Sequence, residues 1–239
     1  MRRRLADRLL VQAQVRSVEQ RTPRLRQVTL SGPGLSGLAW VPGQQVRLQV
    51  ADSPAAVDWL VGALRTYSVW DYDGQDMRLI MMDHGDGPGA AWSRTVAPGQ
   101  DVMLIKPQGT FVTAPAAYHL FAGEETAQVA FGPMLRALPD DAPVFARLET
   151  GGPDDQLDLG REKGDIDWVF RAGRPAASSE GLVDAVRALT LPEEPGRAYL
   201  AGEARTVQMV RRHLVQERGW PRRNVLTKPF WTPGRTGLD

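Results

Sequence analysis

The sequence contains no cysteine among its 239 residues. This absence excludes disulfide bonds, iron–sulfur clusters held by thiolates, and catalysis by a cysteine nucleophile. Histidine is also scarce, with three residues, and the sequence offers no convincing transition-metal site. Any electron-transfer chemistry in this chain would therefore need a bound organic cofactor.

An excess of charge of one sign and a long hydrophobic run are missing as well. The formal net charge is +1, which is too balanced to argue for a nucleic-acid partner. No window reaches the apolar length of a membrane span, and the arginine-rich start lacks an apolar core, so we expect no membrane span and a cytoplasmic location. With 42% hydrophobic and 24% charged residues, the composition is typical of a globular enzyme.

The first half of the chain is rich in short strand patterns separated by turns. Six segments read as strands, at residues 11–15, 26–30, 45–50, 66–70, 77–82 and 101–105. Turn formers such as Pro42-Gly43 and Asp73-Gly74 separate them, and only 89–96 looks helical. The pattern predicts a six-stranded antiparallel Greek-key β-barrel domain over residues 1–114.

The second half alternates strands with helices. The strand patterns lie at 118–122, 144–148, 168–170, 197–201 and 224–227, and the helical ones at about 126–138, from 178 onward and at about 204–218. This alternation predicts a mostly parallel α/β sandwich domain over residues 115–239, with ligands at the carboxyl ends of its strands. The Asp- and Gly-rich segment 151–164 predicts a mobile surface loop, and no Gly-x-Gly-x-x-Gly motif marks a standard dinucleotide loop.

The segment Arg65-Thr66-Tyr67-Ser68 brings a cation, an aromatic ring and two hydroxyls onto one predicted strand. These groups suit a flavin dinucleotide, because Tyr67 can lie against the ring, Ser68 can bond the ring edge and Arg65 can hold phosphate. The alternative is a plain barrel strand with Tyr67 in the core and Arg65 in a surface ion pair.

A glycine-rich turn that opens a helix follows one strand later. Small residues there let a phosphate approach the free amides at a helix N-terminus. A lone histidine at a strand end, such as His84, is more often a structural hydrogen-bonding group than a catalyst. The predicted phosphate-binding corner comprises Asp83, His84, Gly85, Gly87, Pro88, Gly89 and Ala90.

A β-barrel followed by an α/β domain is the order of ferredoxin-reductase-like flavoenzymes. At the motif level the chain resembles the siderophore-interacting protein family of FAD-dependent ferric-siderophore reductases. Besides the two motifs above, the matching segments are 22–30, 42–44, 123–127, 201–203 and 230–234. The resemblance implies FAD between the two domains, NADPH or NADH as the reductant, and a ferric siderophore or other ferric chelate as the substrate.

The resemblance also implies roles for residues in the second domain. Thr126 and Glu203 would contact nicotinamide or flavin from strand ends, although both also suit helix N-termini. Trp231 would lie in a terminal segment that returns toward the flavin. The residues implied to receive the anionic chelate are Lys228, Arg47 and Arg235.

Two features leave the identity of the reductant undecided. After Thr126 this chain has Gln128-Val129-Ala130 where the family has Leu-Pro-Ala, so nicotinamide binding by this segment is not settled. Arg205, Arg211 and Arg212 could meet the extra phosphate of NADPH or form a solvated helix face.

We hypothesise a monomeric FAD-dependent ferric-siderophore reductase without a nucleic-acid partner, in which ferredoxin is a further candidate donor. The alternatives are a general flavin or ferredoxin-type reductase with another acceptor, and a non-catalytic flavin- or chelate-binding module.

Overall fold

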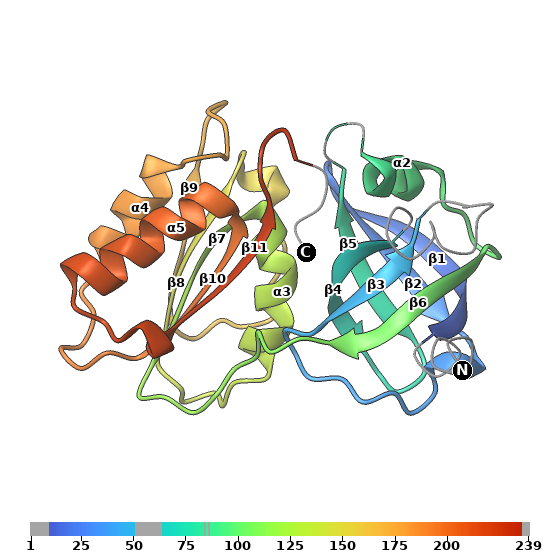
Figure 1. Ribbon diagram of the computed structural model, residues 1–239, viewed down its shortest axis with the longest axis horizontal. Helices are drawn as coiled ribbons and strands as arrows, with labels where there is room; N and C mark the ends of the chain where they lie inside the picture. The colour runs from blue at the N-terminus through green and yellow to red at the C-terminus, as the bar shows by residue number, and fades with distance from the viewer. Residues whose placement is uncertain (1–9, 51–63, 84, 86, 236–239) are drawn as a thin grey trace. The chain divides into compact units, whose positions relative to one another are not determined.

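The chain forms two compact units, Met1–Val112 and Thr113–Asp239, in the computed structural model shown in Figure 1. The division falls two residues before the boundary expected after residue 114. The structure describes residues 10–50, 64–83, 85 and 87–235. None of the helices in these residues is long and apolar enough to cross a membrane.

The first unit is a closed barrel of six antiparallel strands, which confirms the predicted architecture. Around the barrel the order is β1-β2-β5-β4-β3-β6. The strands are β1 (Leu10–Thr22), β2 (Leu25–Ser31), β3 (Gln45–Gln49), β4 (Leu64–Tyr72), β5 (Met77–Met82) and β6 (Asp101–Gln108), and the short 3₁₀ turn η1 (Pro33–Leu35) follows β2. The first strand is longer than the expected 11–15 because its pairing with β2 continues to Thr22. Two register shifts interrupt this pairing along the way.

The barrel interior is filled by alternate residues of the strands, as a period of two requires. Leu48, Leu79 and Leu104 are fully buried there. The helix α2 (Pro88–Thr95) closes against this core through Trp92, which belongs to the same apolar cluster. Trp92 is therefore an anchor that sets where the helix lies on the barrel.

The second unit is a five-stranded sheet in the order β11-β10-β7-β8-β9, with every pair parallel. Its strands are β7 (His119–Glu124), β8 (Val144–Thr150), β9 (Asp165–Phe170), β10 (Arg197–Glu203) and β11 (Val225–Trp231). The connections are α3 (Glu125–Arg136), η3 (Pro153–Asp155), α4 (Glu180–Arg187), α5 (Ala204–Arg212), a π-helical turn η4 (His213–Glu217) and η5 (Arg222–Asn224).

The chain order places a topological switch point between β7 and β10. From β7 the chain moves to β8 and β9 on one side, then returns to β10 and β11 on the other. In open α/β sheets, ligands bind outside the carboxyl ends of the strands at such a point. The ends of β7 and β10, at Glu124 and Glu203, are therefore where a ligand of this unit is expected.

Each face of the sheet has its own helical cover. Leu120 and Leu200 lie in an apolar cluster with Val183 of α4 and Val207 of α5. On the other face Phe121 packs edge-to-face on a phenylalanine of α3, with ring centroids 5.2 Å apart. This cover holds α3 and α5 with their N-termini at the carboxyl edge.

Three expectations about the second unit need correction. The strand β11 continues to Trp231 instead of ending at residue 227, and the third helix is α-helical only to Arg212 before its π turn. The segment 151–164 is also not a free surface loop. Leu157 and Leu159 are buried, and the Leu157 amide donates to Gln128 at 2.8 Å, so burial outweighs the loop-like composition.

Candidate functional site

The predicted phosphate-binding corner is built around Gly89. This glycine lies in the first turn of α2, directly against two side chains of β4. A Cβ placed on Gly89 would be 2.5 Å from the Tyr67 hydroxyl and 3.6 Å from Cγ of Arg65. Only a residue without a side chain lets the helix start this close to Arg65 and Tyr67.

The N-terminus of α2 is open to an anion. Its N-cap residue Gly87 makes no side-chain hydrogen bond to the helix, Pro88 occupies the first turn, and no acidic residue lies there. The amides of a first helical turn have no intrahelical partner and favour negative charge. The corner thus combines unfilled backbone donors with the nearby cation of Arg65.

The loop before α2 is fixed by an arginine of the helix itself. Arg94 forms an ion pair with Asp83 and donates to the Gly85 carbonyl at 3.2 Å. Asp83, expected to contact a cofactor, thus has a structural partner in the protein. Arg94 was not singled out from the sequence, and His84 lies outside the described residues.

The motif strand β4 divides its four residues between two faces of the barrel wall. Tyr67 pairs with the buried Val46, and Arg65 with the buried Leu48, so both point to the interior side. Thr66 and Ser68 lie on the outer face, where Thr66 pairs with Arg47 of β3.

Tyr67 packs against the barrel core while remaining partly exposed. Burial raises the pKa of Tyr67, and the charge of Arg65 partly counteracts this rise. Tyr67 is therefore a neutral phenol at physiological pH, with its hydroxyl at the helix start. Tyr67 therefore packs against the barrel core, as the alternative interpretation expects. Its exposed part still suits a contact with a flavin ring.

In the second unit, β7 and β10 end in the same way. Gly123-Glu124 and Gly202-Glu203 close the two strands, and each glutamate is the N-cap of the helix that follows. The carboxylate of Glu203 accepts from the amides of Arg205 at 2.9 Å and Thr206 at 2.8 Å. The sequence places both Gly-Glu pairs at strand ends, and the structure adds that both glutamates cap the helices that follow.

The two capping carboxyls differ in their proton affinity. Burial would raise the pKa of Glu203, but hydrogen bonds from backbone amides hold it below the ordinary value. Burial raises the pKa of Glu124 to about 7, with the charge of Glu125 adding to the rise. Thr126, expected to contact a cofactor, is bonded to Glu124 through both its amide and its hydroxyl.

Trp231 meets this same corner. Its indole N–H donates to Oε1 of Glu124 at 3.0 Å. Of the second-unit residues predicted from the sequence, Thr126 and Trp231 are therefore brought together on one carboxylate. Glu203 belongs instead to a separate network with α4.

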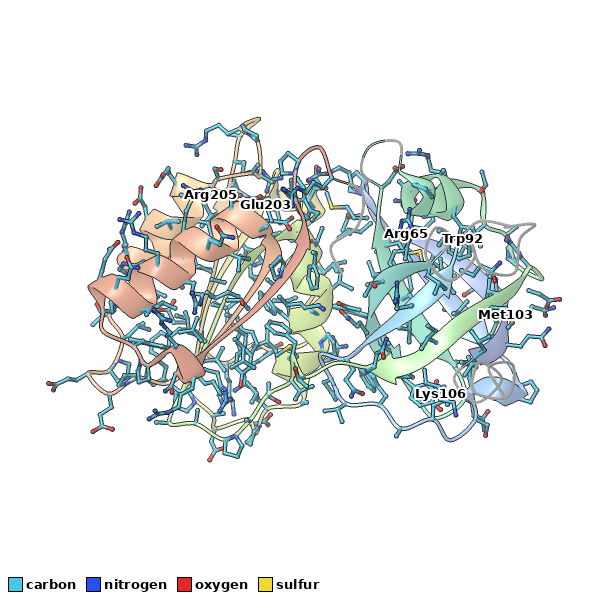
Figure 2. All side chains as sticks on the ribbon, viewed as in Figure 1. Arg65, Trp92, Met103, Lys106, Glu203 and Arg205 are labelled. Atoms are coloured by element: carbon cyan, nitrogen blue, oxygen red, sulfur yellow. The ribbon has the colours of Figure 1, made fainter. Side chains whose placement is uncertain are left out.

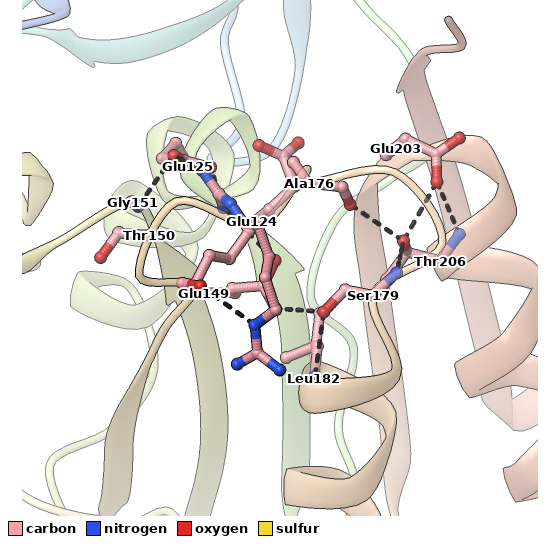
Figure 3. Close-up of polar contacts among 12 residues, drawn as sticks. Glu124, Glu125, Glu149, Thr150, Gly151, Ala176, Ser179, Leu182, Glu203 and Thr206 are labelled. Atoms are coloured by element: carbon pink, nitrogen blue, oxygen red, sulfur yellow. Dashed lines mark hydrogen bonds and ion pairs between the residues drawn. The ribbon is translucent and has the colours of Figure 1, made fainter.

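That network is shown in Figure 3 and crosses the carboxyl edge of the sheet. Arg171, the residue after β9, forms a buried ion pair with Glu125 and a second with Glu149 at 3.3 Å. Ser179, the N-cap of α4, is bonded to Glu149 and accepts from the Leu182 amide. Arg171, Ser179 and the amide of Thr206 thus provide hydrogen-bond donors to the buried carboxylates of Glu125, Glu149 and Glu203.

Lys228 is half-buried on the edge strand β11, opposite Ala201 of β10. Burial lowers the pKa of Lys228. Within the part of the chain that the structure describes, its ammonium group has no hydrogen-bonding or ion-pair partner. Arg235 is exposed beyond the end of the strand, and Arg47 is half-buried on β3.

The exposed side of α5 carries a basic hollow of about 380 Å³. Its lining includes the three arginines noted in the sequence and one from η5: Arg205, Arg211, Arg212 and Arg222. Figure 2 shows Arg205 beside Glu203 at the start of this helix, and Arg65 and Trp92 on the barrel unit. The hollow can accept an anionic group, because the lining holds no carboxylate.

Comparisons with known proteins cover both units. A family model described as "Siderophore-interacting FAD-binding domain" matches residues 14–111, and one described as "Siderophore-interacting protein" matches residues 116–234. A siderophore utilization protein from T. fusca superposes with a TM-score of 0.83 at 26% identity, covering 96% of this chain and 95% of its own.

Curated relatives match over part of their length. Ferric vibriobactin reductase ViuB of Vibrio cholerae is 29% identical over 178 residues, which is 72% of this chain and 65% of the relative. A Mycobacterium bovis protein is 30% identical over 187 residues, 66% of its length. The chain thus spans about two thirds of the length of these two curated relatives.

A more distant structure supports the fold alone. The ferredoxin reductase of carbazole 1,9a-dioxygenase is 20% identical, with a TM-score of 0.74, and covers 92% of this chain and 68% of its own. The fold, a closed barrel followed along the chain by a parallel sheet with helices, is therefore ferredoxin-reductase-like, as expected from the sequence.

Proposed function

The chain belongs to the siderophore-interacting protein family, and on that premise we propose that it is an FAD-dependent reductase of ferric siderophores. The observation that carries the proposal is the corner at Gly89, where an uncapped helix start meets Arg65 inside a unit that matches a FAD-binding family. A structural relative and a ferric-chelate reductase relative support the same chemistry.

The residues present fit a flavin dinucleotide. The open first turn of α2 and the guanidinium of Arg65 would hold the diphosphate, because both supply donors for anionic oxygen. Among the described residues, no heavy atom lies within 4 Å of a Cβ built on Gly87, in front of the helix. Tyr67 would contribute its partly exposed ring, and Ser68 a hydroxyl from the outer face of β4.

The bound flavin would supply the exchange between a two-electron donor and one-electron acceptors. One reduced nicotinamide carries two electrons, so it reduces two ferric ions and releases one proton. Hard oxygen ligands hold Fe(III) more tightly than Fe(II), and reduction therefore weakens the chelate. We place the release of iron in the cytoplasm.

The protein's own part is to bind and orient. Lys228 supports binding of an anionic ferric chelate, because a half-buried ammonium without a described partner gains most from a bound anion. Arg47 and Arg235 are weaker candidates for the same task. No side chain needs to act as an acid, a base or a ligand of the iron.

The donor in this proposal is NADPH or NADH, bound at the carboxyl ends of β7 and β10. The arginine-lined hollow on α5 would favour NADPH over NADH by binding the extra phosphate of NADPH. Ferredoxin remains the alternative donor, and a general flavin reductase the alternative enzyme.

The test is the absorbance spectrum of the purified protein, with FAD added where it is colourless, followed by anaerobic titration with NADPH and NADH. Steady-state turnover is then compared between ferric siderophores, free flavin and ferredoxin. We expect flavin bands, bleaching by a nicotinamide and turnover of ferric siderophores. A preparation that ignores FAD, or activity with a protein acceptor alone, would overturn the proposal.

A further inference from the structure

The end of β11 pairs with β10 through an irregular stretch of backbone. The strand is at the edge of the sheet, so one side has no neighbouring strand. Pro229 has no N–H to give to the ladder, and the pairing with β10 shifts register between Gly202 and Glu203. The pairing resumes with Trp231 opposite Glu203, but on one side of an irregularity only, so a side-chain contact adds to what fixes this strand end.

The indole of Trp231 supplies that contact. Its N–H donates to Glu124 at 3.0 Å, across 107 positions of sequence. Among the described residues, no other side chain of β11 makes a hydrogen bond or an ion pair. The Glu124–Trp231 bond is thus what fastens this strand end to the β7–α3 corner.

Glu124 is itself held in place from two further sides. Its oxygens accept from the amide of Thr126 at 3.1 Å and from the hydroxyl of the same residue. On the side of β10, a Cβ at Gly202 would lie 2.6 Å from Oε1 of Glu124, so the glycine leaves room for the carboxyl and nothing more. The carboxyl is 1% exposed and cannot turn to solvent without breaking these contacts.

We propose that Glu124 is a positioning residue that fixes the ring of Trp231 and, with it, the end of the strand that carries Lys228. Its effect on turnover rests on the proposed function, in which Lys228 is assigned to the ferric chelate. The bond itself is a property of the folded chain.

The charge of Glu124 sets how firmly Trp231 is held. The ionised carboxylate accepts from all three donors, whereas the protonated form has one oxygen engaged as a hydroxyl and holds the indole more weakly. Burial brings the pKa of Glu124 to about 7, so both forms are populated near neutral pH. The charged groups on neighbouring elements are Glu125 of α3, Glu203 of β10, Lys228 of β11, and Arg171, which pairs with Glu125.

The experiment follows the indole N–H of Trp231 by NMR in the full chain labelled with ¹⁵N-tryptophan, between pH 6 and 8. The Trp231→Phe variant assigns the resonance. We expect it to shift with pH in the wild type and to remain fixed in Glu124→Gln, whose amide oxygen still accepts but does not titrate. Trp168→Phe is the matched control, because Trp168 lies on β9 at the opposite edge of the sheet.

A double-mutant cycle gives a second reading. We expect Glu124→Ala to change the unfolding equilibrium constant about fivefold less in the Trp231→Phe background than in the wild type. Additive effects, or an indole resonance in the wild type that ignores pH, would overturn the proposal. If Glu124→Ala does not fold, the NMR comparison of the wild type with Glu124→Gln still tests the proposal.

These readings need no substrate, so they separate this inference from the proposed function. An intact Glu124–Trp231 coupling in a protein that turns over no ferric siderophore would refute the function alone. Where turnover is present, we expect Glu124→Gln to lose the change in kcat between pH 6 and 8. Glu124→Ala should raise KM at both pH values.

Discussion

The hydroxyl of Tyr67 lies in the space that a side chain at Gly89 would need, 2.5 Å from a Cβ built on that glycine. The start of α2 and the wall of the barrel are therefore fitted to each other at one pair of residues. This fit brings the unfilled amides of the helix close to Arg65. It also separates two roles of glycine in the same turn, because no atom of the described part of the chain lies within 4 Å of a Cβ built on Gly87.

Gly89→Ala should destabilise the first unit even without flavin. The added methyl overlaps Tyr67, and overpacking of this kind costs about 1–3 kcal/mol, more than the gain in helix propensity. Urea unfolding of the apoprotein measures the change. Gly87→Ala is the matched substitution: it should leave apoprotein stability unchanged and weaken flavin binding. Equal stability of Gly89→Ala and the wild type would contradict the packing described.

Arg65→Gln should weaken FAD binding about tenfold or more, because a charge-assisted hydrogen bond to phosphate is removed. Fluorescence titration of FAD with the apoprotein measures the dissociation constant. Arg78→Gln is the control, since Arg78 pairs with Asp71 and Asp73 on the barrel surface. An unchanged dissociation constant in Arg65→Gln would remove Arg65 from the phosphate site.

The sequence was sufficient for the architecture because the two halves carry different periods. Alternation in the first half and strand–helix alternation in the second predicted the closed barrel and the parallel sheet. It was not sufficient for β11, because Pro229 interrupts the strand pattern and an edge strand tolerates a proline that an interior strand does not. Lys228 and Trp231 were therefore predicted as residues of a tail rather than of a strand.

Long-range polar pairs were beyond sequence patterns. Arg171 and Glu125 are 46 positions apart, and nothing local marks them as partners. Segment 151–164 was misjudged because its glycines and aspartates outweighed Leu157 and Leu159, whose spacing by two is a burial signal. The glycine-rich corner was predictable because a helix N-terminus is a local feature.

Arg171→Met should be severely destabilising. It leaves the buried carboxylates of Glu125 and Glu149 without their cation, and breaking a buried pair costs about 3–5 kcal/mol. The deficit in urea unfolding should shrink toward acidic pH, where both carboxyls can protonate. Arg187→Gln, which breaks a solvent-exposed ion pair, should cost far less. A loss of that small size in Arg171→Met would contradict the described network.

Lys228→Gln should raise KM for an anionic ferric chelate about tenfold and change kcat little, because the charge acts in binding. The dependence of KM on ionic strength should fall in parallel. Steady-state kinetics at two salt concentrations measure both effects, with the exposed Lys163→Gln as the control. A fall in kcat at unchanged KM would instead place Lys228 in the electron-transfer step.

The buried carboxyl of Glu124 should make the folded state less stable as pH rises. Its pKa is about 7 in the folded chain and near 4.5 in the unfolded one, so between these values the folded state binds more protons. Stability is then fully present below pH 4.5 and falls through pH 7, by on the order of 3 kcal/mol relative to Glu124→Gln. Urea unfolding of the wild type and the variant from pH 4 to 8 measures this difference.

A comparison of opposite sign isolates the effect of burial. The exposed Glu217 has its pKa lowered by His213 and Arg187, so its contribution to stability should grow with rising pH and be lost in acid. Relative to Glu217→Gln, the wild type should therefore lose stability only as pH falls below about 4.5, and should change little between pH 5 and 7, where it loses stability relative to Glu124→Gln. If the wild type lost no stability between pH 5 and 7 relative to Glu124→Gln, the altered proton affinity of Glu124 could not be assigned to its buried position beside Glu125, and the pH-dependent hold on Trp231 would lose its physical basis.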